Sequence, residues 1–536
     1  MDENKQAVAE GVALSLVPQH SFGSLAAPIN GVQSYSTSGR TASSDDRDTS
    51  ERLVFRVGRR ICVYDPTAQK QRFFTGRATN VTNILHFSVA ANAKYVALCE
   101  SVRSDRAEIT TAQASIFNTT KLGRVKTIST EAKGEYVCSA WCENNKYLAC
   151  LLEGVEECEV HIWSWEKEKI FKSVSVGARV TKIGAALGHT LVTTSGVGIL
   201  KSWYVAADSS LKADNLLPPA KEMEHSFSDH LWLPHATGHH GHGGSEHRML
   251  ALGEHDPSLN PHTPMTPGTS LVVDRSRGDE SSVGGGSTLS GSAGGDRPPR
   301  QALFVFDGLE QPKTSPNAPI DLQLKSTIPI KNTLKVDSIA HTSKGVVLVG
   351  LSGAVVYMEK TDDSGKREAY VEMRSLVLHE MSLLSACTLN CGDSMIVLTA
   401  TNRLLNIDMA QLTSESVPTI RGGEKGGGGT VSADSSVVGA GAGEGSTAAS
   451  TANSIECTDL FDCGFHGVIT AASIPRLRST VVTISSKERC ARVWSLSKMK
   501  CEFVHEFRQE EPVAVGVHPT GSMCLVSFKD RVKLYN

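Results

Sequence analysis

The sequence contains no apolar run long enough to cross a membrane. Its longest run, Val346 to Met358, is interrupted by Gly350, Ser352 and Gly353, whereas a membrane-spanning helix needs about 20 consecutive apolar residues. The N-terminus also lacks the basic-then-apolar pattern of a secretory signal. We therefore expect a cytoplasmic protein that does not bind membranes.

An excess of charge of one sign is missing as well. The formal net charge is −3 over 536 residues, and no basic stripe with interleaved aromatic residues is present. Proteins that bind nucleic acid carry such stripes because they must neutralise phosphate groups. We therefore expect no nucleic-acid partner.

The 13 cysteines include no Cys-x-x-Cys pair. The closest pairs, Cys138 with Cys142 and Cys387 with Cys391, are spaced more widely than most zinc ligands and lie on extended segments. Many other cysteines occupy strand-like positions, where a small apolar side chain packs well. We expect buried, reduced thiols, no metal and no cofactor.

Motifs of known catalytic chemistry are also lacking. The chain has no His-Glu-x-x-His and no nucleophile elbow. The Gly-rich segment around Lys425 superficially resembles a phosphate-binding loop, but Gly426 follows the lysine where that loop needs Ser or Thr. We therefore expect no catalytic residue.

Three strand-like runs between Gly464 and Trp494 form the clearest pattern in the chain. Val468 to Ser473, Thr480 to Ser485 and Cys490 to Trp494 are β-prone and are separated by polar turns. This layout is typical of one blade of a WD-type β-propeller.

Such blades often hold a buried hydrogen-bonded relay of a turn His, a Ser or Thr, an acid and a Trp. Here the four places are occupied by His466, Ser486, Glu488 and Trp494. The relay satisfies polar turn groups that would otherwise remain unpaired. We expect a structural role for these residues, because nothing nearby resembles a positioned nucleophile.

The same three-run pattern recurs in degenerate form. Clear copies cover 136–163, 180–204, 336–358 and 383–407, and weaker ones lie between residues 53 and 117. Most copies lack the His and the acid, so packing between apolar strands must stabilise them. The predicted fold is all-β: a WD-repeat β-propeller of seven blades with long disordered insertions, plus the first blades of a second propeller.

The expected domains are an N-terminal tail at 1–21, the first propeller at 22–463, and the incomplete start of a second propeller at 464–536. Flexible insertions are expected at about 36–50, 236–300 and 413–453. Small and polar residues dominate there, so little apolar surface can offset the entropy of ordering. The segment from Glu456 to Cys463 should supply the last outer strand of the first propeller.

Two features of the 236–300 region suggest chemistry. Thr263 and Thr266 each precede a proline, which predicts phosphorylation by a proline-directed kinase. A dense group of imidazoles there could hold a transition metal, although a solvated low-complexity tract is the simpler interpretation. The histidines concerned are His235, His239, His240, His242 and His247.

Five segments, in collinear order, carry a resemblance to a ciliary WD-repeat family, the cilia- and flagella-associated proteins. Leu53 to Gly76 resembles the first blade of that family. His225 to Pro234 is similar to the strand that opens its fifth blade, and Gln301 to Gly308 to the outer strand of the same blade. Phe465 to Glu506 and Gln509 to Asn536 resemble two consecutive later repeats.

The resemblance implies a non-enzymatic scaffold of the motile cilium or flagellum axoneme. Members of the family contribute to the placement of inner dynein arms on doublet microtubules and to ciliary motility, so axonemal components are the expected partners. A cytosolic WD-repeat scaffold unrelated to cilia is an alternative. A propeller hydrolase is a further one, but it would need convergent polar groups at the central channel.

The chain departs from the family pattern in two ways. Both long insertions are extra, and the family continues into a complete second propeller and a coiled coil. This sequence stops at Asn536, inside the second blade of that propeller, and contains no sustained heptad pattern. The sequence-based expectation is a fragment of a longer protein.

Overall fold

The structure is a computed structural model, and it describes most of the chain outside the long loops. The described residues are 31–38, 49–76, 80–102, 111–154, 157–177, 180–186, 188–205, 210–218, 221–222, 224–233, 247–256, 300–310, 320–360, 370–378, 381–389, 393–413, 430–431, 457–461 and 469–536. Their strands form nine antiparallel sheets. The all-β prediction is confirmed.

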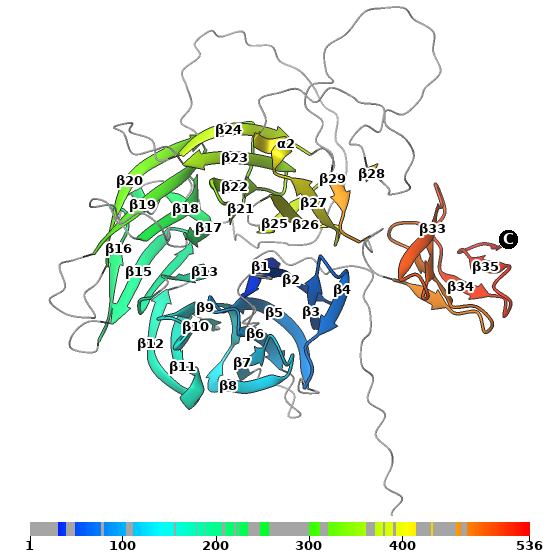
Figure 1. The fold of residues 1–536 in the computed structure, drawn as a ribbon, viewed down its shortest axis with the longest axis horizontal. Helices are drawn as coiled ribbons and strands as arrows, with labels where there is room; N and C mark the ends of the chain where they lie inside the picture. The colour runs from blue at the N-terminus through cyan, green and yellow to red at the C-terminus, as the bar shows by residue number, and fades with distance from the viewer. Residues whose placement is uncertain are drawn as a thin grey trace, which may run out of the picture.

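Seven of these sheets follow one another around a ring (Figure 1). Blade 1 contains β1 (Val32–Ser38), β2 (Thr49–Val57), β3 (Arg60–Asp65) and β4 (Lys70–Phe73). Blade 2 contains β5 (Val81–Val89), β6 (Tyr95–Val102), β7 (Thr111–Asn118) and β8 (Arg124–Lys133). Blade 3 contains β9 (Glu135–Cys142), β10 (Tyr147–Glu153), β11 (Cys158–Ser164) and β12 (Lys169–Gly177), with the 3-10 turn η1 (Trp165–Lys167) before β12.

The other half of the ring is built in the same way. Blade 4 contains β13 (Val180–Ala185), β14 (Leu191–Gly196), β15 (Ile199–Val205) and β16 (Leu211–Asn215). Blade 5 contains β17 (His225–Trp232), β18 (His247–His255), β19 (Gln301–Glu310) and β20 (Ile320–Ile330). Blade 6 contains β21 (Ser338–His341), β22 (Gly345–Val349), β23 (Ala354–Lys360) and β24 (Tyr370–Val377). Blade 7 contains β25 (Leu383–Leu389), β26 (Ser394–Thr399), β27 (Leu404–Asp408), the short helix α2 (Ala410–Thr413), β28 (Thr430–Val431) and β29 (Cys457–Asp459).

Burial along the strands follows from their place in a blade. The second strand of blade 6, β22, has the sequence GVVLV and is buried at every position. Neighbouring blades cover both of its faces, so the usual alternation of apolar and polar residues is absent. The outer strand β20 alternates buried and exposed residues over most of its length, because one of its faces meets solvent.

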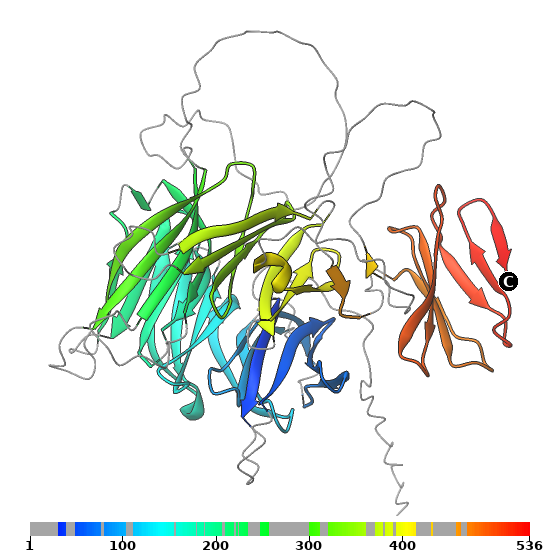
Figure 2. The ribbon, with the colours of Figure 1, turned by 45° about the horizontal axis from the view of Figure 1, so that its top comes forward.

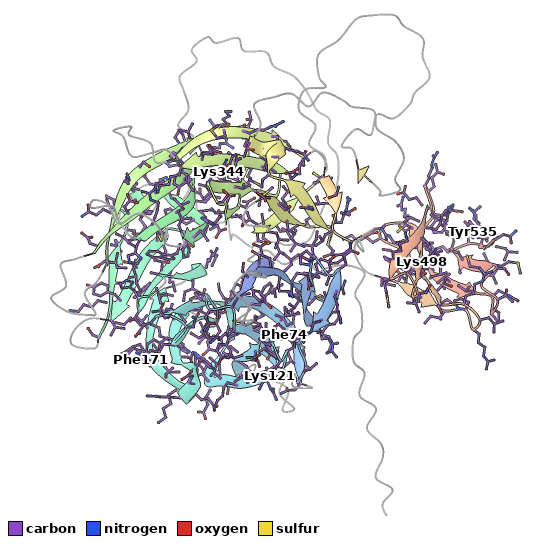
Figure 3. All side chains as sticks on the ribbon, in the orientation of Figure 1. Phe74, Lys121, Phe171, Lys344, Lys498 and Tyr535 are labelled. Atoms are coloured by element: carbon purple, nitrogen blue, oxygen red, sulfur yellow. The ribbon has the colours of Figure 1, made fainter. Side chains whose placement is uncertain are left out.

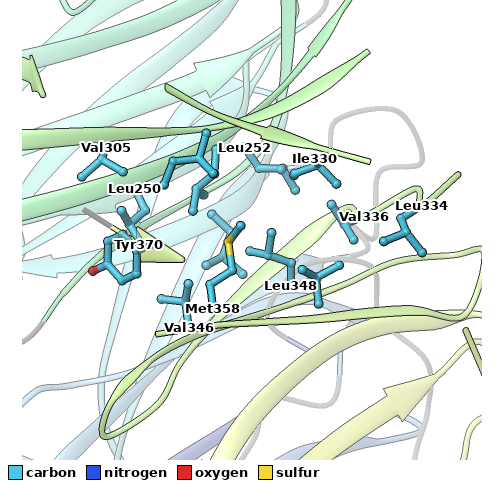
Figure 4. Packing of buried hydrophobic residues seen from close by; sticks show 14 of the residues in the cluster. Leu250, Leu252, Val305, Ile330, Leu334, Val336, Val346, Leu348, Met358 and Tyr370 are labelled. Carbon is cyan, nitrogen blue, oxygen red and sulfur yellow. The ribbon is translucent and has the colours of Figure 1, made fainter. Parts of the chain in front are cut away.

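Apolar side chains from facing sheets hold neighbouring blades together. Between blades 5 and 6, Leu250, Leu252 and Val305 pack against a cluster that includes Val346 and Leu348 (Figure 4). All five are fully buried. Each such residue contributes about 1.5 to 3 kcal/mol on burial, so the contacts between blades dominate the stability of the ring.

The ring closes between blades 7 and 1. Leu53 and Phe55 of β2 pack with Ile396 and Leu398 of β26 in one buried cluster. The ring of Phe461, just after β29, lies 5.5 Å from that of Phe55. β29 pairs with β27 and with the two-residue β28. The segment after the Gly-rich insertion therefore supplies the fourth strand of the blade, and β28 takes the outermost position that the sequence assigned to this segment.

The extents of the predicted insertions are wrong at three places. β18 lies inside the predicted 236–300 insertion and is the second strand of blade 5, paired with β17 and β19. Its short apolar run Met249–Leu252 is fully buried, which outweighs the polar composition around it. β1 and β2 pair through Ser38 and Thr49, inside the predicted 36–50 loop, and β28 lies inside 413–453. The domain boundaries themselves stay predictions.

Blade 5 also corrects an assignment within the family resemblance. The segment from Gln301 to Gly308 belongs to β19, which is the third strand of its sheet. The outer strand is β20, which pairs with β19 along its whole length. The resemblance placed this segment one strand too far outward, because β18 lies in a predicted insertion and is the second strand of the sheet.

Two further sheets follow the ring and form what we call the C-terminal unit, residues 469–536 (Figure 2). The first contains β30 (Ala471–Ser473), β31 (Thr480–Ser485), β32 (Cys490–Ser495) and β33 (Lys500–Glu506). The second contains β34 (Ala514–Val517), β35 (Cys524–Ser527) and β36 (Val532–Tyr535). The two sheets share one core that includes Ile484, Phe507 and Val526, and so stack as neighbouring blades do.

Candidate functional site

The residues of the predicted relay in the C-terminal unit have partners that differ from the expected ones. The Trp494 indole donates its proton to Thr483 Oγ1 at 2.7 Å, and Trp494 is 1 % exposed. The Ser486 hydroxyl donates to the Pro512 carbonyl. Glu488 lies 3.1 Å from the guanidinium of Arg492.

Thr483 therefore takes the place that the sequence assigned to Ser486. The pairing of the two strands explains the difference. Thr483 is directly opposite Arg492 on β32, and Arg492 and Trp494 are alternate residues on the same face of that strand. Ser486 lies beyond the end of β31, in the turn. His466 lies outside the described residues, so the complete relay stays a prediction.

Blade 3 contains a relay that the sequence analysis missed. Trp163 donates its indole proton to Tyr136 Oη at 3.0 Å. Tyr136 Oη is 2.9 Å from His161 Nδ1, and His161 Nε2 is 2.9 Å from a Glu159 carboxylate oxygen. Since a carboxylate only accepts, Nε2 carries the imidazole proton and Nδ1 accepts the tyrosine proton. Burial raises the pKa of Tyr136, which keeps it a donor.

A second unpredicted relay joins blades 4 and 5. His230 on β17 places its two ring nitrogens 2.9 Å from Thr193 Oγ1 and 2.7 Å from Ser195 Oγ, both on β14. Trp232 donates to the same Thr193 hydroxyl at 3.0 Å. Burial, and then the nearby charge of Lys182, hold the pKa of His230 well below its usual value. The imidazole is therefore neutral at physiological pH.

Glycine makes this approach possible. A Cβ added to Gly184, directly opposite Thr193, would lie 2.5 Å from His230 Nε2. Only a residue without a side chain leaves room for the imidazole between the two blades.

A buried ion pair lies beside His230 and links three blades. Lys182 on β13 pairs with Asp229 on β17, and both side chains are buried. The other Asp229 oxygen accepts the backbone N–H of Ile339 on β21 at 2.8 Å. A buried carboxylate with two partners fixes the relative position of blades 4, 5 and 6.

Two glutamines connect further pairs of blades by a shared geometry. The Gln33 side chain donates to Phe87 O at 3.0 Å and accepts from Val89 N at 2.9 Å, which joins β1 to β5. Gln301 makes the same two-way contact with the backbone of Val336, at 2.9 and 3.0 Å. Each glutamine side-chain amide thus forms hydrogen bonds with backbone groups across two sheets that share no backbone ladder.

The other predicted site residues lie mostly outside the described residues. Thr263, Thr266 and four of the five clustered histidines belong to this group, and their roles stay predictions. The fifth, His247, begins β18 and is buried, with its ring 4.6 Å from that of His189. Within the described part of the chain, no group of three or more His, Cys, Asp or Glu side chains is placed to hold a metal ion.

These polar groups mainly satisfy one another between the blades, so they position the sheets instead of presenting reactive atoms. The eleven cysteines in the described ranges are free thiols. No helix among the described residues is both long and apolar enough to cross a membrane.

The surface of the C-terminal unit is unusually apolar. Leu525 and Leu534 are directly opposite each other on β35 and β36, and Val532 lies on the same face of the sheet. All three are at least half exposed. We call these three residues the apolar face. Phe503 on β33 is also exposed, and Tyr535 at the end of β36 is labelled in Figure 3. Exposed apolar patches of this kind mark contact surfaces.

Comparison with known proteins agrees with the family resemblance. The chain is 20% identical over 500 residues to mouse Cilia- and flagella-associated protein 57, a match that covers 90% of this chain and 34% of that protein. The predicted resemblance is confirmed. The chain thus spans about a third of the length of this curated relative. No profile of a known protein family matches the chain.

Two solved structures are similar at 8% identity. One is the Cps50 (Swd1) β-propeller domain of Myceliophteria thermophila, with a TM-score of 0.29 over 86% of this chain and 98% of that one. The other is a chain of the mitotic checkpoint complex, with a TM-score of 0.42 over 76% of this chain and 98% of that one. The propeller assignment rests on the seven sheets and the closed ring described above.

Proposed function

We propose that this chain is a non-enzymatic WD-repeat scaffold of the motile cilium or flagellum, where it contributes to inner dynein arm placement and to the regulation of motility. The observation that carries the proposal is the collinear likeness to Cilia- and flagella-associated protein 57 over 90% of the chain. The axoneme is the proposed location, and components of the inner dynein arms and doublet microtubules are the proposed partners.

The architecture supports a scaffold. Apolar clusters and polar contacts join neighbouring blades, so the ring holds its loops and rim in fixed relative positions. A rigid propeller can bind several partners at separate surfaces. The polar groups near the centre have partners on neighbouring blades, which favours a structural role for them over substrate binding.

The apolar face of the C-terminal unit is the proposed contact with other axonemal components. The three side chains project from one face of the sheet formed by β34, β35 and β36. Exposed apolar patches of this kind mark contact surfaces. A partner that covers this face would bury the three side chains.

The test is the location of the tagged full-length chain in flagellated cells. We expect it in the detergent-resistant axonemal fraction. The variant Leu525→Glu/Leu534→Glu should fold but move to the soluble fraction, whereas the control Lys529→Glu, at an exposed residue of the same sheet turn, should stay with the axoneme. If the parent chain is soluble and diffuse, the ciliary function is wrong and a cytosolic scaffold remains. If the double variant stays in the axonemal fraction like the parent, the ciliary function stands and the apolar face is not the contact.

A further inference from the structure

Two cross-strand pairs face each other between blades 2 and 3. In blade 2, His86 on β5 is directly opposite Cys99 on β6. In blade 3, Ser139 on β9 is directly opposite Cys150 on β10. Directly opposite residues present their side chains on the same face of a sheet, with Cβ atoms about 4.5 to 5.5 Å apart. Each pair therefore acts as one unit on its own sheet.

The two units are in register across the interface. His86 Nδ1 accepts the backbone N–H of Ser139 at 3.2 Å and lies 3.3 Å from the Ser139 hydroxyl. Because His86 lies on Ser139, their strand partners Cys99 and Cys150 are brought together, and both belong to one buried cluster between the two sheets. Both cysteines are 0% exposed.

Small side chains bring the two sheets close at this place. Ala97, Ala112 and Ala114 of blade 2 belong to the same buried cluster as Cys99 and Cys150. Packed sheets are commonly about 10 Å apart. An alanine side chain has a single carbon atom, so these alanines let the two sheets pack more closely. The close approach of the two sheets at this place favours a bond between the two sulfur atoms, which would be about 2 Å long.

His86 prepares Cys99 for reaction. His86 Nδ1 accepts a backbone N–H, and its Nε2 lies 3.7 Å from Cys138 Sγ. The hydrogen bond from Cys150, and then that from His86, lower the pKa of Cys99 to about 6 against the effect of burial. Burial raises the pKa of Cys150 well above its usual value. Cys99 is therefore the more acidic thiol of the pair.

Cys138 also contacts His86, and that imidazole lowers the pKa of Cys138 against the effect of burial. Burial dominates at two other buried thiols. Burial raises the pKa of Cys62, and it raises that of Cys142 to about 12. Such thiols are inert because the thiolate is the nucleophile. The cluster around His86 is also not placed to hold a metal ion.

We propose that Cys99 and Cys150 are a peroxide-sensitive thiol pair that closes to a disulfide and locks blade 2 to blade 3. The Cys99 thiolate attacks a hydroperoxide, which breaks the O–O bond and gives a sulfenic acid at Cys99 and an alkoxide or hydroxide that takes up a proton. The Cys150 thiol then attacks the sulfenic sulfur and releases water. In sum, two thiols and one hydroperoxide give one disulfide, one alcohol or water, and one further water.

Burial of the thiols lowers the rate of their oxidation but does not change the product. A peroxide reaches the interface only when the two blades open locally, so the reaction is slower than oxidation of an exposed thiol. The disulfide then prevents further opening, because it joins strands that share no backbone ladder.

The experiment treats the full-length chain with hydrogen peroxide and maps cysteines by mass spectrometry without reduction. We expect a peptide that links Cys99 to Cys150 and is two hydrogens lighter than the two free peptides. The control variants Cys62→Ala and Cys142→Ala should give the same linked peptide. Cys150→Ala should instead give a sulfenic acid at Cys99 that dimedone traps, and Cys99→Ala should leave Cys150 as a free thiol.

His86→Gln tests the positioning role. The linked peptide should form about tenfold more slowly than in the parent, and the difference should shrink at pH above 9, where Cys99 ionises without help. Thermal melts of the reduced variants identify any that do not fold. Recovery of Cys99 and Cys150 as free thiols while the half-buried Cys501 is oxidised would overturn the proposal. A link from Cys99 to Cys138 would overturn the assigned pairing.

Discussion

Hydroxyl groups accept the indole protons of four tryptophans, whereas Trp141 and Trp165 donate to backbone carbonyl oxygens. A tryptophan N–H that is buried without an acceptor costs about 1 to 3 kcal/mol, so each blade that uses the residue must also supply an oxygen. The acceptors come from a different strand in every case. The pairs are Trp163 with Tyr136, Trp203 with Thr194, Trp232 with Thr193 and Trp494 with Thr483.

Removal of Trp494 should unfold the C-terminal unit. Trp494→Ala deletes a buried side chain and leaves the Thr483 hydroxyl without its donor, at a cost of about 3 to 5 kcal/mol. Thr483→Val keeps the shape and removes only the acceptor, so it should cost about 1 to 2 kcal/mol. Limited proteolysis at increasing concentrations of denaturant measures the loss of stability in both variants. Equal resistance of Trp494→Ala and the parent would contradict the buried role of the indole.

The ion pair between Lys182 and Asp229 should matter far more than its exposed counterparts. Asp229→Asn leaves a buried ammonium group without a countercharge, which should destabilise the ring by about 3 to 5 kcal/mol. The matched control is Glu372→Gln, because Glu372 pairs with the largely exposed Lys331; that change should cost less than about 1 kcal/mol. Denaturant unfolding followed by tryptophan fluorescence compares the two. A similar loss for both variants would contradict the account.

His230 should make the ring sensitive to mild acid. Its pKa is lowered in the folded state by burial, then by Lys182, so below its ordinary value of 6.5 the unfolded chain binds a proton that the folded chain does not. The contribution of His230 is therefore complete above pH 6.5 and is lost progressively as the pH falls below that value. Urea melts from pH 7.5 to pH 5 should show this decline. His230→Gln should be less stable at pH 7.5 but should lose less on acidification, and an unchanged slope would refute the assignment.

At the scale of the strand, the outer edges of the blades share one irregularity. In each of five outer strands, one residue is skipped in the register with the neighbouring strand. A bulge of this kind twists the edge and prevents pairing with other chains. Phe171, at the rim in Figure 3, is one of them. The skipped residues are Val125, Phe171, Lys325, Met373 and Glu502.

β18 gives a sharp prediction about the long insertion of blade 5. Deletion of 257–299 should leave the fold intact, because His255 N donates to Arg300 O at 2.6 Å and a short turn can join these two ends. The stability change should be about 1 kcal/mol at most, since loop closure entropy depends weakly on length. Deletion of 236–300 removes β18 and its buried apolar run, and should unfold blade 5. Circular dichroism and thermal melts compare the two deletion variants. Equal stability of the two variants would contradict the position of β18 in blade 5.

At the scale of the whole molecule, the ring and the C-terminal unit have separate cores. Each core cluster of the ring that we describe joins residues of neighbouring blades, and the last of them connects blade 7 to blade 1. The cluster of the C-terminal unit contains only residues from 471 onward. The two parts should therefore unfold independently.

Calorimetry of the full chain should thus give two transitions. Trp494→Ala should lower only the transition of the C-terminal unit, and Asp229→Asn only that of the ring. A single transition that shifts with either variant would show that the two parts unfold as one cooperative unit.

The sequence by itself determined which segments are strands and how they repeat. The runs at 180–185, 190–195 and 199–204 agree with β13, β14 and β15 to within one residue, because β-branched runs and turn residues are local signals. The same signals failed at β18, where a four-residue apolar run lies among polar residues. The spacing Glu159-x-His161-x-Trp163 was available as a signal for the blade 3 relay, since alternate residues share one face of a strand.

Only the tertiary structure decided which polar groups meet. Asp229 and Ile339 are 110 residues apart, and His230 and Ser195 are 35 apart. Such contacts depend on how closely two sheets approach, which is set by the volumes of side chains such as Gly184, Ala97 and Ala114 at the interface. A periodic pattern specifies the face on which a residue lies, but the partner across the interface follows only when both sheets are packed together.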